Sequence, residues 1–196
     1  ESANFTAVGS SSGDSMNLNV RRSSSDTDKS ITGSMTITMG DGNDSLLSAR
    51  FIDGDSVDMG AGDDTVDIMT DNSNGTSTYA ALSMTKLDGG TGTDTLNFSN
   101  MGSQGSTELT LTGGGATNFE NIFGSIGDDI IRGDTAANIL RGHRGEDTIY
   151  GGSGNDILLA GTTLWSPNND TASQRQEAAN YSGDEAADYN DKLYGG

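Results

Sequence analysis

Between Gly115 and Leu159 the sequence repeats a nine-residue pattern five times without a gap. Each unit has glycine at its first place, an oxygen-bearing side chain at its sixth and a large aliphatic residue at its eighth. Such strict phasing indicates the stacked coils of a solenoid, because a disordered chain has no reason to keep one aliphatic residue in register. In order, the units carry Gly115, Gly124, Gly133, Gly142 and Gly151; Glu120, Asp129, Asn138, Asp147 and Asp156; and Ile122, Ile131, Leu140, Ile149 and Leu158.

Similar glycine-rich turns recur upstream at wider spacing, in residues 39–44, 59–64 and 89–94. A short stretch of alternating apolar and polar residues precedes each turn and another follows it, which predicts strand, turn and strand. The acidic anchors Asp44, Asp64, Asp94 and Asp129 lie 20, 30 and 35 residues apart. We therefore expect upstream coils with one glycine-rich edge and longer loops on the opposite edge, and we place Asp14 outside this register.

Two nonads make one coil of the regular run, so residues 18 positions apart share an edge. Asp129 and Asp147 are expected on one edge, and Asn138 and Asp156 on the other. The aliphatic residue at place eight is expected to point inward and to stack on its equivalents. One such residue per nonad gives a thin core, whose burial is unlikely to offset the cost of ordering the backbone.

Composition limits the partners of the chain. With 29 acidic and 10 basic residues, its net charge of -19 disfavours nucleic acid and anionic membranes and favours cations. The chain has no cysteine, which excludes disulfides and thiolate zinc sites. No apolar run reaches the roughly 18–20 residues of a membrane span, so membrane insertion is not expected.

Calcium suits such turns because it takes roughly 6–8 oxygen ligands, many of them backbone carbonyls. Glycine reaches positive φ at little steric cost and lets successive carbonyls point inward, while the acid at place six adds a carboxylate. An ion held between stacked turns crosslinks two coils. Calcium binding is therefore expected to supply part of the folding free energy, and the apo protein is expected to be largely unfolded.

The units GSxGDDxI, GxRGEDTI and GGSGNDIL resemble the glycine-rich repeats of the RTX (repeats-in-toxin) family. That family includes toxins, proteases, lipases, epimerases, adhesins and S-layer proteins. The resemblance implies an all-β, right-handed parallel β-roll that binds several Ca²⁺ ions. It also implies type I secretion from a Gram-negative bacterium, in which the chain leaves the cell unfolded and folds in extracellular calcium.

In the family, the acid at place six and the turn residues ligate calcium. The resemblance carries this role to Gly40, Gly42, Asp44, Gly60, Gly62, Asp64, Gly90, Gly92, Asp94, Gly124, Gly127, Asp129, Gly133, Asn138, Gly142, Gly145, Asp147, Gly151, Gly152, Gly154, Asp156 and Asp191. Three positions depart from the pattern: Asn138 replaces Asp, His143 replaces the second glycine, and Glu120 stands in Asn-Phe-Glu.

The expected organisation has five parts. Residues 1–34 form a degenerate N-terminal coil or cap, and residues 35–114 form irregular coils with one glycine-rich calcium edge. Residues 115–160 form the regular roll. Residues 161–188 form an insertion that contains Trp165 and suits a short polar helix capped by Asp170, and the repeat resumes in residues 189–196.

No catalytic motif is visible, since HExxH and GxSxG are both absent. The acid pairs Asp63-Asp64 and Asp128-Asp129 have equivalents at other turns, which favours a structural role. The sequence therefore favours a non-catalytic segment of an adhesin, S-layer or surface filament, with self-association or neighbouring repeats as partners. Two alternatives are the calcium-dependent secretion and folding module of an exported enzyme, and a module in which Trp165 and the loops bind a surface glycan or peptide.

Overall fold

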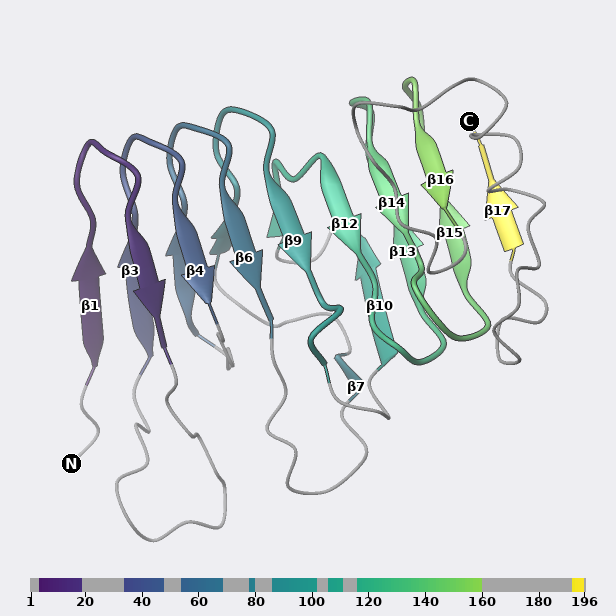
Figure 1. Ribbon diagram of the computed structural model, residues 1–196, viewed down its shortest axis with the longest axis horizontal. Helices are drawn as coiled ribbons and strands as arrows, with labels where there is room; N and C mark the ends of the chain where they lie inside the picture. Colours follow the sequence, from purple (N-terminus) through teal and green to yellow (C-terminus); the bar gives the residue numbers. More distant parts are fainter. Residues whose placement is uncertain are drawn as a thin grey trace, which may run out of the picture.

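The computed structural model describes residues 4–18, 34–47, 54–68, 78–79, 86–101, 106–110, 116–159 and 192–195. Figure 1 shows short strands stacked along the long axis of the molecule, from the N-terminal coil to the C-terminal one. Every named element in these ranges is a strand and every pairing is parallel, so the predicted all-β parallel roll is confirmed. The predicted short helix, Trp165 and Asp191 lie outside the described residues.

The coils alternate between two faces. One face is a seven-stranded sheet whose strands, in spatial order, are β2 (Ser15–Asn17), β4 (Ser45–Leu47), β6 (Thr65–Asp67), β9 (Thr95–Asn97), β12 (Asn121–Phe123), β14 (Ile139–Arg141) and β16 (Ile157–Leu159). The opposite face has two five-stranded sheets. One contains β1 (Phe5–Val8), β3 (Met35–Thr38), β5 (Ser56–Asp58), β8 (Lys86–Asp88) and β11 (Ala116–Thr117), and the other contains β7 (Thr78–Tyr79), β10 (Ser106–Thr110), β13 (Ile130–Arg132), β15 (Thr148–Tyr150) and β17 (Lys192–Tyr194).

Each strand pairs in register with the strand one coil further on. In the seven-stranded sheet Leu46 lies opposite Val66, and Val66 lies opposite Leu96. These central residues are fully buried while the residues on either side of them are half-buried, as expected when alternate side chains point inward. Four of the five aliphatic residues at place eight of the regular run follow the same rule and are fully buried: Ile122, Ile131, Leu140 and Ile149. In the last strand Leu158 is only half-buried, and its neighbour Leu159 is buried instead.

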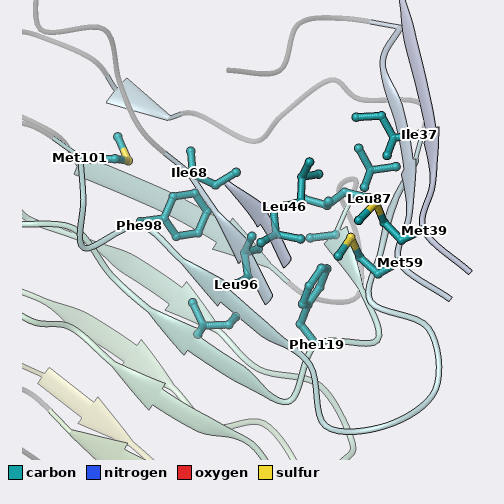
Figure 2. Close-up of a cluster of buried hydrophobic side chains, with 14 of the residues drawn as sticks. Ile37, Met39, Leu46, Met59, Ile68, Leu87, Leu96, Phe98, Met101 and Phe119 are labelled. Carbon is teal, nitrogen blue, oxygen red and sulfur yellow. The ribbon is translucent and has the colours of Figure 1, made fainter. Parts of the chain in front are cut away.

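The core of the upstream coils is thicker than one aliphatic residue per unit. Figure 2 shows Met39, Met59, Phe98 and Phe119 packed around the stacked aliphatic residues. The two methionines begin their turns, and Phe98 directly follows β9. The core of these coils therefore contains more than the central residue of each strand, because residues at the ends of the turns also point inward.

The last coil is held by an aromatic contact on the outer surface. β17 pairs with β15, which brings the rings of Tyr150 and Tyr194 together with centroids 4.7 Å apart and planes 10° apart. The guanidinium carbon of Arg132, one coil earlier, lies 5.0 Å from the centroid of the Tyr150 ring. Strand pairing thus aligns a short column of stacked side chains along this face.

The turns form two edges. The upper edge in Figure 1 holds the turns that lead into the seven-stranded sheet: residues 9–14, 39–44, 59–64, 89–94, 118–120, 133–138 and 151–156. The lower edge holds turns 124–129 and 142–147, which leave that sheet. The predicted edge partners are confirmed, because β13 pairs with β15 and β14 pairs with β16.

Two details of the predicted register are different in the structure. The upper edge continues from Asp94 to Glu120, whereas Asp129 lies on the lower edge, so the series of acidic anchors changes edge. Asp14 is inside the register, because its backbone N–H donates to Asp44 and β2 pairs with β4. Spacing along the chain alone does not reveal these relations when the intervening loops differ in length.

Candidate metal-binding turns

A ladder of hydrogen bonds runs along the upper edge through the acids at place six. The Oδ1 atom of Asp44 accepts from the backbone N–H of Asp14 at 2.7 Å, and each later acid accepts from the coil before it. The N–H of Asp44 donates to Asp64 and that of Asp64 donates to Asp94, both at 2.8 Å. The N–H of Asp94 donates to Oε2 of Glu120 at 2.8 Å. One carboxylate oxygen of each acid therefore joins neighbouring coils.

The residues at place five form a second ladder in the opposite direction. The Oδ1 atom of Asn43 accepts from the N–H of Asp63 at 3.0 Å, and Oδ1 of Asp63 accepts from the N–H of Thr93 at 2.9 Å. Adjacent acids such as Asp63 and Asp64 thus bind backbone groups of different coils. This arrangement supports the predicted structural role of the acid pairs.

The second carboxylate oxygen of several acids is buried without a hydrogen bond. The Oδ2 atoms of Asp44, Asp64, Asp94 and Asp156 accept none from any described residue. The first three side chains are almost fully buried, with 2%, 1% and 0% exposure, respectively. An unsatisfied buried oxygen of this kind is costly unless a cation or another partner meets it. These oxygens therefore fit a cation such as Ca²⁺, which binds oxygen ligands.

The local electrostatics favour the same conclusion. Burial raises the pKa of Asp94 to about 6, a hydrogen bond from the N–H of Asp64 opposes this rise, and the charges of Asp64 and Glu120 add to it. Burial also raises the pKa of Asp64. The ionised carboxylates are thus disfavoured in the protein alone, and a nearby cation would offset both desolvation and mutual repulsion.

Five of the described turns share one backbone conformation. In turns 39–44, 59–64 and 89–94 the second and fourth residues are glycines with φ between 101° and 143°. Turn 151–156 has the same conformation at Gly152 and Gly154, and turn 142–147 has it at His143 and Gly145. We call these five turns the open turns. Their φ values lie in the region where glycine carries no Cβ penalty.

Three other turns close on their own side chains. The N–H of the second residue donates to the residue at place six, over 2.6 Å from Ser10 to Asp14 and 2.7 Å from Ser125 to Asp129. The N–H of Asp134 donates to Oδ1 of Asn138 at 3.0 Å. The second and fourth residues of these turns have φ values outside the left-handed region. We call residues 9–14, 124–129 and 133–138 the closed turns.

Stacking of the open turns also requires glycine for steric reasons. A Cβ atom added to Gly60 would overlap the carbonyl oxygen of Gly40, and one added to Gly90 would overlap that of Gly60. These carbonyls accept hydrogen bonds of 2.9 Å from Ala61 and Thr91, respectively. Successive turns are therefore in direct backbone contact, and the glycines permit this approach.

The predicted site residues thus fall into different groups. Asp44, Asp64, Asp94, Asp147 and Asp156 lie in open turns, whereas Asp129 and Asn138 lie in closed turns. In the part of the chain that the structure describes, no group of three or more acidic or histidine side chains is placed to hold a metal ion. Each open turn offers one carboxylate at place six, so backbone carbonyls would have to complete a calcium shell.

Asp55, on the lower edge, is a further buried acid that was not among the residues predicted from the sequence. Its side chain is fully buried, and its Oδ1 atom accepts from the N–H of Met35 at 2.7 Å. It joins upstream coils as Asp147 joins Asp129 further along the chain. The available signal was its place two residues before the buried Val57, which matches the spacing from Asp129 to Ile131.

Fold and turns together define a parallel β-roll whose edges carry buried carboxylates and glycine-rich backbone. Residues 121–161 match the family model of the RTX calcium-binding nonapeptide repeat, in 4 copies. This segment therefore consists of RTX repeats, a structural type of repeat that binds Ca²⁺. No curated protein matches the chain. Among the described residues, no helix is long and apolar enough to cross a membrane.

Proposed function

We propose that this chain is a calcium-stabilised, non-catalytic segment of a large secreted or cell-surface protein, such as an adhesin, S-layer protein or surface filament. The RTX repeats in residues 121–161 support calcium binding and a structural role. The stacked coils support the same role, because a solenoid held by contacts between neighbours suits an elongated, stiff element. Its proposed partners are calcium, neighbouring repeats and further copies of the chain.

The observation that carries this proposal is the buried, unpaired Oδ2 atom of Asp44, Asp64 and Asp94. Each lies in a turn whose glycines have positive φ and whose backbone contacts the next turn. Calcium held there would receive carboxylate and backbone oxygens and would join two coils. The net charge of -19 gives binding a second effect, since each ion removes repulsion within the compact chain.

Calcium control of folding would also suit export. In a cell with little free calcium, the repelling carboxylates keep the chain unfolded and able to pass through a secretion channel. Outside the cell, calcium binds only the folded arrangement of the turns and shifts the equilibrium toward it. We therefore place the protein outside a Gram-negative cell after type I secretion.

The experiment is calcium-dependent folding followed by far-UV circular dichroism. Addition of Ca²⁺ to chelated protein should produce the β-sheet signal, and excess chelator should abolish it. Mg²⁺ at the same concentration is the control, because it demands a smaller, near-octahedral oxygen shell and should not restore the fold. A spectrum that is the same in calcium and in chelator would contradict the proposal.

The architectural role needs a separate measurement. Sedimentation velocity in saturating calcium should show an elongated particle that associates as the protein concentration rises. A globular monomer at every concentration would contradict the role in a lattice or filament and would leave calcium-dependent folding intact.

A further inference from the structure

The two kinds of turn are not mixed along the solenoid. Three open turns, residues 39–44, 59–64 and 89–94, follow one another on the upper edge. Two more, residues 142–147 and 151–156, lie at the C-terminal end of the regular run. Between these groups stand the closed turns 124–129 and 133–138. The family match begins at residue 121, so the first group lies wholly outside it.

In the closed turns, the side chain at place six accepts a hydrogen bond from the second residue of its own turn. In turn 124–129, Oδ2 of Asp129 accepts from the N–H of Ser125 at 2.7 Å, and Oδ1 accepts from the hydroxyl of Ser125 at 2.8 Å. In turn 133–138 the side chain is the neutral amide of Asn138, whose oxygen accepts from Asp134. These turns satisfy the place-six side chain from within the turn, whereas Asp44, Asp64 and Asp94 each keep one unpaired carboxylate oxygen.

In the open turns of the first group, the acid at place six is only partly satisfied by hydrogen bonds within the protein. Asp44, Asp64 and Asp94 each use Oδ1 to join coils and leave Oδ2 buried and unpaired. Positive φ at the second residue accompanies the absence of the closing hydrogen bond seen in the closed turns. The second residue of the turn thus decides whether the acid is satisfied within the protein or needs a cation.

We infer that residues 39–94 form a calcium-binding stack of their own, separated from the C-terminal open turns by turns 124–129 and 133–138, whose place-six side chains do not ligate calcium. The inference rests on the proposed function and specifies which turns perform it. The ions of the stack lie at the two interfaces between its three turns, where Asp44, Asp64 and Asp94 supply the carboxylates. The chain therefore has two calcium-binding units, and the upstream one lies outside the RTX match.

The test counts bound calcium by equilibrium dialysis of the full chain at physiological ionic strength. Asp64→Asn should lower the number of ions bound at saturation by at least one. Asp63→Asn is the matched control, because it removes the same charge from an exposed side chain of the same turn. Asp129→Asn, with Asp128→Asn as its control, should leave the number unchanged, since Asp129 is already satisfied by Ser125.

Hydrogen exchange followed by mass spectrometry keeps the test decisive if a variant is less stable. In saturating calcium, Asp64→Asn should accelerate exchange in the coils of residues 35–97 and leave residues 139–159 unchanged. Equal acceleration in both regions would overturn the inference of two units. Loss of an ion in Asp129→Asn, or the same count in Asp64→Asn and Asp63→Asn, would overturn the assignment of sites. A wild-type chain that binds no calcium would instead refute the proposed function.

Discussion

Gly60 offers a direct test of the contact between stacked turns. It has a φ of 101°, and an added Cβ would overlap the backbone carbonyl of Gly40 in the preceding coil. Gly54 is a matched control because its φ is 89° but the nearest atom to an added Cβ is the Cβ of Ser34, at 3.7 Å. Gly54→Ala therefore introduces only backbone strain, whereas Gly60→Ala introduces the same strain together with a clash.

The two substitutions should lower the free energy of unfolding by amounts that differ several-fold. A left-handed backbone at a residue with a Cβ costs about 1 kcal/mol, which lowers the Tm of a chain of this length by about 3 °C. Gly60→Ala should cost about 4 kcal/mol or more, because a backbone carbonyl cannot move without disturbing the hydrogen bond from Ala61. That cost corresponds to a Tm lowered by about 12 °C. The assay is thermal unfolding by circular dichroism in saturating calcium, and equal losses in both variants would refute the requirement for close backbone stacking.

Three further predictions use the same assay. His143→Gly should raise the Tm by about 3 °C, because it removes a side chain from a left-handed backbone with a φ of 84°. Asn118→Gly, at a φ of 56°, should raise the Tm less, because asparagine tolerates this region better. A lower Tm in His143→Gly would contradict this reasoning. Asp55→Ala should lower the free energy of unfolding by about 1–3 kcal/mol, because it leaves the N–H of Met35 unsatisfied. Asp55→Asn keeps an acceptor and should lower it less. Equal losses of stability in the two variants would contradict the role of this hydrogen bond. Leu96→Ala should lower the free energy of unfolding by about 2–5 kcal/mol, since the side chain is fully buried between Val66 and Ile122. Thr93→Ala, at an exposed position, is the control, and a smaller loss of stability in Leu96→Ala than in this control would contradict the stacked core.

The sequence was sufficient to predict the repeat, the strands and the edge partners of the regular run. The nine-residue period fixes these features because each coil repeats the same backbone path, so Asp129 and Asp147 must share an edge. Place eight likewise predicts the buried position of Ile131 and Leu140. These are local relations, and they follow from spacing without knowledge of the loops.

The upstream register was harder to predict because loops of unequal length separate the coils. Asp55 was missed because its turn lacks the glycine pattern of the others, although its position before Val57 is the same as that of Asp129 before Ile131. Only strand pairing shows that these residues occupy equivalent places.

The closed turns also show why the nonapeptide pattern is an incomplete guide to calcium sites. Asp129 satisfies the pattern at place six, but Ser125 at place two donates both its N–H and its hydroxyl to that carboxylate. Asp94 has the same place in its turn, but Gly90 adopts a φ of 104° and the second carboxylate oxygen stays unpaired. Glycine and aspartate at regular spacing therefore specify the coil, whereas the residue at place two specifies its need for a cation. A solenoid can in this way combine coils that fold on calcium with coils that are complete without it, while a single strand register continues through both.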